Sequence, residues 1–226
     1  MKQIKINFFG DSTCVGQNVA LHKGWIPRLS AALEDVAQKQ GFEAIVTNTS
    51  ANGRTTRQAL EAMPYEIQSN HPHILIVQFG LNDCNYWESD QGVPRVSPNA
   101  FKANLEEIIA RAFVFGTKVV FLNTNHPTGR DKTKMPYTNI TFQQSNREYN
   151  RIICQVANQN NEKVILNNIE KEFYDFAEGD QEKILKLLIP EPDLLHVNEA
   201  GHQLYYKVVY RTLVESVLSL ANADKL

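Results

Sequence analysis

Residues 8–16 read Phe8-Phe9-Gly10-Asp11-Ser12-Thr13-Cys14-Val15-Gly16, and here the first apolar run of the chain gives way to a polar turn. The apolar residues before the turn predict a short β-strand that enters a core. We expect Gly10 to let the backbone bend sharply and to place Ser12 at the carboxyl end of this strand, where open α/β sheets bind ligands. Ser12 is therefore a candidate functional residue, although a Gly-Asp-Ser turn alone is also an ordinary helix cap.

The same succession of apolar run and polar turn recurs along the chain. Apolar runs predict further strands over 42–49, 73–79, 118–122 and 163–166. Helical spacing predicts helices over 24–40, 55–70, 99–116, 141–160 and 198–220, with a mixed helical connection over 170–188. This alternation indicates a doubly wound α/β fold, in which helices cover both faces of a five-stranded parallel sheet.

Composition narrows the class of protein. A chain of 226 residues suits one domain, here residues 1–226, and a formal net charge of -2 without a basic block argues against nucleic acid as a partner. The segment 1–7 does not resemble a secretory leader, and the 3 cysteines are too scattered for a disulfide framework. We therefore expect a cytoplasmic protein. No run approaches the roughly 20 apolar residues of a membrane span, and the sequence leaves the oligomeric state open.

Five residues offer the groups that acyl transfer requires. Ser12, Gly53 and Asn82 follow predicted parallel strands, so all three should meet at one edge of the sheet. Asp193 and His196 lie in the loop before the last helix, which must pack back onto the sheet. Ser12 can attack a carbonyl, His196 can accept its proton, and Asp193 can orient the imidazole. The amide N–H groups of Ser12, Gly53 and Asn82 can then bind the oxyanion.

The motifs that carry these residues resemble those of the SGNH/GDSL hydrolase family. Gly10-Asp11-Ser12 is similar to the first motif of that family, Gly53 to the second, Gly80-Leu81-Asn82-Asp83 to the third and Asp193-Leu194-Leu195-His196 to the last. Thr13 replaces the leucine that usually follows the serine. The resemblance implies a flavodoxin-like three-layer α/β/α sandwich and a serine esterase or lipase, with Ser12, Asp193 and His196 as the catalytic triad and Ser12, Gly53 and Asn82 as the oxyanion hole.

Substrate specificity is expected in two irregular segments, 84–98 and 123–139, because loops at strand ends carry function. Tyr86 and Trp87 are candidates to stack on a sugar ring. The candidates to meet an anionic group are the basic residues of the two segments: Arg95, Arg130, Lys132 and Lys134. Neither segment has the long apolar stretch of an acyl-chain tunnel. We therefore predict a short-chain, acetyl-type esterase of a carbohydrate, such as an acylated glycan, or of a small-molecule ester. A lysophospholipase or thioesterase is the alternative, and an acyltransferase stays open.

Other classes of protein fit less well. A flavin- or nucleotide-binding module could use the turn at 10–16, but the turn matches no phosphate-binding motif and leaves Asp193 and His196 unexplained. An ordinary α/β-hydrolase needs Gly-x-Ser-x-Gly, and Cys14 occupies the place of the second glycine. A metal hydrolase could recruit Asp11, Asp83, Asp193 and His196, but the usual histidine or cysteine spacings are missing. We expect no metal and no cofactor.

The remaining polar candidates receive structural roles. Asp11 and Asp83 are expected to hold the backbone of their turns, and Cys14 and Cys84 to pack in the core. No catalytic role is assigned to the other histidines: His22, His71, His73, His126 and His202.

Overall fold

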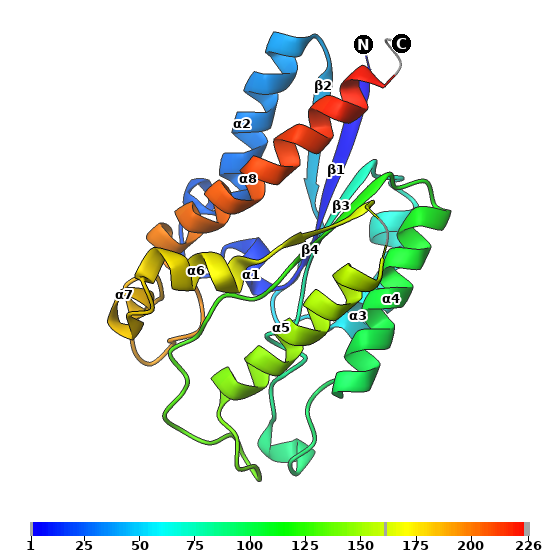
Figure 1. Cartoon of the computed structure of the whole chain (residues 1–226). Coiled ribbons are helices and arrows are strands. Elements are labelled where there is room, and N and C mark those ends of the chain that lie inside the picture. The colour runs from blue at the N-terminus through cyan, green and yellow to red at the C-terminus, as the bar shows by residue number, and fades with distance from the viewer. Residues whose placement is uncertain (1, 161, 224–226) are drawn as a thin grey trace.

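The computed structural model describes residues 2–160 and 162–223; Met1 and residues 224–226, the ends of the predicted domain, lie outside the described residues. Within this part of the chain, five strands form one parallel sheet (Figure 1). They are β1 (Gln3–Gly10), β2 (Glu43–Asn48), β3 (Ile74–Gln78), β4 (Val119–Asn123) and β5 (Val164–Asn167). Their spatial order is β2-β1-β3-β4-β5. The chain therefore adds β2 on one side of β1 and then crosses over to add β3, β4 and β5 on the other side, which puts the switch point between β1 and β3. Such a switch point is where doubly wound sheets open a ligand crevice.

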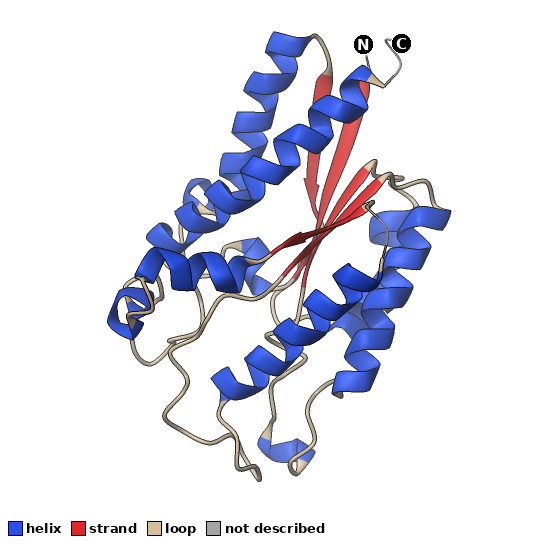
Figure 2. Ribbon diagram, in the orientation of Figure 1, coloured by secondary structure: helices blue, strands red, loops and turns tan. Residues whose placement is uncertain are grey.

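Two layers of helices enclose the sheet (Figures 1 and 2). The helices are α1 (Ser12–Val15), α2 (Trp25–Gln40), α3 (Thr56–Met63), α4 (Pro98–Val114), α5 (Phe142–Gln159), α6 (Ile169–Ala177), α7 (Gln181–Leu185) and α8 (Glu199–Asn222). Helices α2, α6 and α8 pack on one face of the sheet, and α3, α4 and α5 pack on the other. This arrangement confirms the predicted three-layer α/β/α fold.

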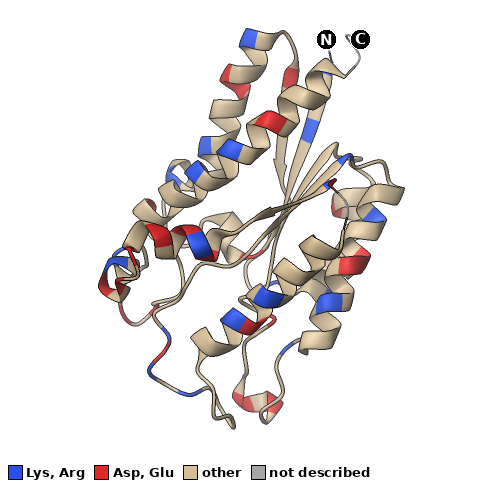
Figure 3. Cartoon of the chain, viewed as in Figure 1, with Lys and Arg blue, Asp and Glu red and all other residues tan. Residues whose placement is uncertain are grey.

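Alternation along the strands supplies both cores. In β3, Ile74 and Ile76 face the α2 and α8 side, whereas Leu75 and Val77 face the α3 and α4 side. All four side chains are buried, as expected for a central parallel strand. Charged residues lie mainly on the helices and loops, with both signs interspersed (Figure 3). None of the described helices combines the length and the apolar character needed to span a bilayer.

Most predicted elements are present, with small shifts at their ends. Gly41 caps α2 in the left-handed region, as its sequence position suggested. The helix predicted over 55–70 instead ends as an α-helix at Met63 and continues as a π-helical turn, Pro64–Gln68, because proline lacks the N–H that the α-helical ladder needs. Helix α1 is not among the predicted elements; it begins directly at Ser12 and is capped by the Asp11 carboxylate.

The prediction that Gly10 makes a sharp bend after the first strand is wrong. Gly10 still belongs to β1 and pairs with β3, so it does not make the bend. A Cβ atom at this position would lie 2.6 Å from Cys14 Sγ and 2.7 Å from the Gln78 carbonyl oxygen. Glycine is therefore required because α1 and β3 approach the backbone too closely for any side chain.

Only part of the segment 123–139 behaves as a surface loop. Asn123 and the next five residues are buried, contrary to the expectation of an exposed specificity loop. Polar side chains of α5 hold this stretch: Asn150 accepts from the Asn125 N–H at 2.7 Å, and Gln143 accepts from the Thr128 N–H at 2.7 Å. The segment becomes more exposed from Gly129 onward.

Candidate active site

The three side chains expected to form a triad lie in a row at the carboxyl edge of the sheet. His196 Nε2 is 2.9 Å from Ser12 Oγ, and His196 Nδ1 is 2.8 Å from Asp193 Oδ2. Because an ionised carboxylate only accepts hydrogen bonds, Asp193 favours the imidazole proton on Nδ1. Nε2 is then free to accept the Ser12 hydroxyl proton. Ser12 is nearly buried and keeps 7% of its surface exposed.

The loop that carries Asp193 and His196 is fixed by its own backbone. Asp193 Oδ1 accepts the N–H groups of Leu195 at 2.8 Å and His196 at 2.6 Å. Leu194 adopts a positive φ of 48°, which turns the chain between the two polar residues. Burial raises the pKa of the Asp193 carboxyl, but hydrogen bonds from His196 and Leu195 outweigh it and hold the pKa below its usual value. Asp193 is therefore charged at neutral pH.

The buried side chain of His126 holds this loop through the Leu195 carbonyl oxygen, a role that the sequence did not reveal. Its Nε2 donates to the Leu195 carbonyl oxygen at 2.7 Å, and its Nδ1 accepts from the Tyr205 hydroxyl at 2.8 Å. Burial lowers the pKa of His126 to about 4, so the ring is neutral and one nitrogen can accept. The residue lies in the buried stretch after β4, and its neighbours in the sequence give no signal of this contact.

The residues expected to bind an oxyanion are joined by a chain of hydrogen bonds. Asn82 Nδ2 donates to Asp11 Oδ2 at 3.4 Å, next to Ser12 in the chain. Arg95 Nη1 donates to Asn82 Oδ1 at 3.3 Å and to the Gly53 carbonyl oxygen at 3.1 Å. Gly53 has a φ of +74° with no atom within 4 Å of the place of a Cβ, so a ligand can approach its backbone. Ser12, Gly53 and Asn82 thus lie around one corner of the sheet edge.

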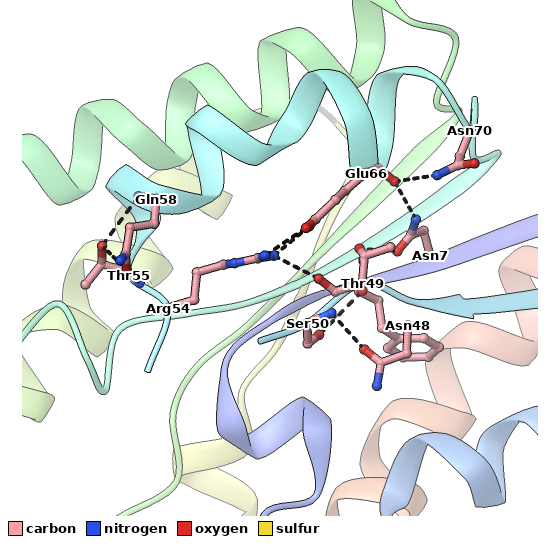
Figure 4. A network of polar contacts seen from close by, with 10 residues as sticks. Asn7, Asn48, Thr49, Ser50, Arg54, Thr55, Gln58, Glu66 and Asn70 are labelled. Atoms are coloured by element: carbon pink, nitrogen blue, oxygen red, sulfur yellow. Dashed lines mark hydrogen bonds and ion pairs between the residues drawn. The ribbon is translucent and has the colours of Figure 1, made fainter. Parts of the chain in front are cut away.

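The loop that carries Gly53 is held by its neighbour Arg54 (Figure 4). Arg54 binds both carboxylate oxygens of Glu66, at 2.6 and 2.8 Å, and donates to the Thr49 carbonyl oxygen at 2.8 Å. This bidentate pair ties the loop after β2 to the π-helical turn. The position of Gly53 is therefore set on one side by Arg54 and on the other by Arg95.

Two buried carboxyls lie under the candidate site. Asp11 Oδ1 accepts the Thr13 N–H at 2.9 Å, and Asp83 Oδ1 accepts from Thr56 through both its N–H and its hydroxyl, at 2.9 and 2.5 Å. Asp11 therefore holds the backbone of its own turn, as predicted, whereas Asp83 holds the first residue of α3 rather than its own turn. Burial raises the pKa of Asp11 to about 7 and that of Asp83 to about 6.

Two hollows flank the candidate site and contain the three residues expected to contact substrate. One, of about 420 Å³, lies between the segments after β3 and β4 and is lined by Tyr86, Arg130 and Leu194 among others. The second, of about 300 Å³, includes Trp87 and Arg95, whose guanidinium carbon lies 4.2 Å from the centre of the indole ring. A hollow of about 450 Å³ over α5 and α6 shares no residue with either.

The geometry at the carboxyl edge agrees with a comparison of the whole sequence. The model of the GDSL-like Lipase/Acylhydrolase family matches residues 8–204. The chain belongs to this family. In the described part of this GDSL-like chain, no group of three or more histidine, cysteine or acidic side chains is placed to hold a metal ion.

Relatives of this GDSL-like chain include two curated esterases. The chain is 27% identical over 128 residues to the protein named arylesterase of Vibrio mimicus, and 25% identical over 118 residues to esterase TesA of Pseudomonas aeruginosa. These matches cover 57% and 52% of this chain, and 58% and 53% of the two relatives. The chain thus spans little more than half the length of the curated relatives it matches.

Solved structures resemble the GDSL-like fold over nearly its full length. An acetyl xylan esterase, AlAXEase, superposes with a TM-score of 0.72 at 20% identity and covers 93% of this chain and 100% of its own. The acetylxylan esterase Axe2 of Geobacillus stearothermophilus superposes with a TM-score of 0.71 at 17% identity, covering 93% of each chain. At this level of identity, the likeness shows the shared fold.

Proposed function

We propose that this protein is a serine hydrolase of carboxylic esters that works through an acyl-enzyme on Ser12. The observation that carries the proposal is the continuous contact from hydroxyl to imidazole to carboxylate, with 2.9 Å between Ser12 and His196 and 2.8 Å between His196 and Asp193. Nucleophilic catalysis requires a base within hydrogen-bond reach of the nucleophile and a group that orients the base. Membership of the GDSL-like family supports the same assignment.

The proposed reaction has two steps. As Ser12 Oγ bonds to the ester carbonyl carbon, His196 Nε2 takes the hydroxyl proton and Asp193 stabilises the imidazolium. The resulting oxyanion would face the N–H groups of Ser12, Gly53 and Asn82. When the carbon–oxygen bond to the alcohol breaks, His196 returns the proton to the leaving oxygen. Water then attacks the acyl-enzyme in the same way, which releases the acid and restores Ser12.

The proposed substrate is a short-chain ester, acetyl in particular, of a carbohydrate or another small polar alcohol. The hollow of about 420 Å³ has charged side chains in its wall, among them Arg130, Lys132 and Lys134, which suit a polar alcohol better than a long alkyl chain. Tyr86 and Trp87 are proposed to contact the substrate because they line the two hollows. Arg95 also lines the second hollow, but its guanidinium is engaged by Asn82, the Gly53 carbonyl oxygen and the Trp87 ring. The names of the relatives, which include arylesterase and acetylxylan esterase, support esters of this kind.

Covalent labelling tests the proposal directly. A fluorophosphonate probe followed by peptide mapping is expected to modify Ser12, and Ser12→Ala should abolish both labelling and hydrolysis of p-nitrophenyl acetate. Ser50, in the neighbouring loop after β2, is the matched control: Ser50→Ala should keep both. Wild-type hydrolysis by Ser12→Ala, or labelling at another serine, would refute the assignment.

A further inference from the structure

Backbone hydrogen bonds between the two ends of the irregular segment after β3 place Arg95 beside the candidate site. The Arg95 N–H donates to the Asn85 carbonyl oxygen at 2.9 Å, and the Val96 N–H donates to the Asp83 carbonyl oxygen at 3.2 Å. These two bonds close the segment into a loop whose ends lie beside Asn82. Arg95 is therefore held where the loop returns to the sheet edge.

The Arg95 side chain is held by an aromatic ring and by two hydrogen-bond acceptors. Its guanidinium packs on the Trp87 ring at 4.2 Å, and Nη1 donates to Asn82 Oδ1 at 3.3 Å and to the Gly53 carbonyl oxygen at 3.1 Å. One nitrogen thus joins the loop after β2 to the turn after β3. These are two of the three places from which oxyanion donors would come.

The partners of Asn82 select one orientation of its amide. Its NH₂ end faces the Asp11 carboxylate, and its oxygen faces the Arg95 guanidinium. Rotating the amide by 180° would set its NH₂ donor against the guanidinium donor of Arg95. An amide NH₂ has two hydrogens, so the bond to Asp11 leaves one for a ligand. A cation on the amide oxygen also polarises the group and makes its N–H a stronger donor.

We propose that Arg95 is a positioning residue of the oxyanion hole, which acts on the reaction by fixing the Asn82 amide. This inference rests on the function proposed above. Because the amide matters most when charge develops on the carbonyl oxygen, loss of Arg95 lowers kcat and leaves KM nearly unchanged. Removing an oxyanion donor costs about 10²–10³ in kcat, and loosening one should cost less, about 10–100-fold.

A double-mutant cycle tests whether Arg95 acts through Asn82. The variants are Arg95→Met, which keeps the apolar stem, Asn82→Ala, and the two combined, each assayed on p-nitrophenyl acetate. Arg95→Met should lower kcat about 10–100-fold in the wild-type background and less than about 3-fold in the Asn82→Ala background. Losses that multiply fully, or a rise in KM with unchanged kcat, would overturn the proposal.

Further variants separate positioning from folding and from the proposed function. Arg95→Lys restores a cation and should retain more kcat than Arg95→Met; equal losses count against the proposal. Arg211, an exposed arginine of α8 that lines neither hollow, is the matched control, and Arg211→Met should keep wild-type kcat. Circular dichroism melts verify that each variant folds. If Ser12→Ala stays active, the proposed function fails; if Ser12→Ala is inactive but the cycle is additive, only the role of Arg95 fails.

Discussion

The hydroxyl of Ser12 lies 2.9 Å from Nε2 of His196, although the two residues are 184 positions apart in the sequence. Ser12 follows β1, which lies between β2 and β3 in the sheet, and His196 precedes α8, which packs beside α2 on one face of the sheet. The contact is therefore made by the packing of the last helix onto the first strand. In the proposed reaction, this contact holds the nucleophile within hydrogen-bond reach of its base before the substrate binds.

Replacing Asp193 by asparagine should lower kcat about 10³–10⁴-fold. The asparagine oxygen can still accept the N–H groups of Leu195 and His196, so the loop keeps its backbone bonds. Its NH₂ would then face His196 Nδ1, which favours the imidazole proton on Nε2 and leaves no acceptor for the Ser12 proton. Steady-state kinetics on p-nitrophenyl acetate measure the loss, with a thermal melt as the folding control. A loss below about 10-fold would contradict the role of Asp193.

Trp25 ties α2 to the turn that carries Ser12, so Trp25→Phe should destabilise the fold. The indole Nε1 donates to the buried Thr13 carbonyl oxygen at 2.9 Å, and the ring packs edge-on against Phe8. Losing the donor leaves that carbonyl unsatisfied, at a cost of about 1–3 kcal/mol in the free energy of unfolding. Urea titration measures it. The other tryptophan of the chain, Trp87, is half-exposed, and Trp87→Phe should change stability by less than about 0.5 kcal/mol.

The buried carboxyl of Asp11 should make stability depend on pH. Its pKa rises from the ordinary 3.8 to about 7 in the fold, so the folded protein holds this proton more tightly than the unfolded chain. The resulting stabilisation is fully present below about pH 4 and is lost as pH rises through about 7. Asp11→Asn removes this dependence and can still accept the Thr13 N–H.

Melting curves between pH 4 and pH 8 measure the effect of Asp11→Asn. The melting temperature of the wild type should fall relative to that of the variant as pH increases across this range. Asp35→Asn, a change of an exposed carboxyl on α2, provides the control and should give curves parallel to the wild type. Parallel curves for Asp11→Asn as well would show that Asp11 titrates alike in the folded and unfolded states.

Sequence alone was sufficient where a short motif follows a strand. Ser12, Asn82 and Gly53 each come after an apolar run, and parallel topology places the ends of such runs together. Asp193 and His196 are three residues apart, so one turn of backbone joins them. Local patterns of this kind predict both the fold class and the candidate residues.

Contacts that depend on how loops close could not be predicted. Arg95 reaches Asn82 only because the ends of its loop pair with each other, and no periodic pattern records that pairing. His126 supports Leu195 from a stretch that reads as a polar loop but is buried. The reason is that polar side chains of α5 such as Asn150 face inward, at positions where helical periodicity predicts apolar side chains.

The length of the acyl chain should decide turnover. A series of p-nitrophenyl esters from acetate to dodecanoate is expected to give the highest kcat/KM at acetate or butyrate, with a steady decline beyond. Each added methylene gains about 0.8 kcal/mol only if it is buried against apolar surface. The wall of the hollow of about 420 Å³ contains Arg130, Lys132 and Lys134, whose charged groups a long chain would have to desolvate. A maximum at octanoate or longer would contradict the acetyl assignment and favour a lysophospholipase or thioesterase.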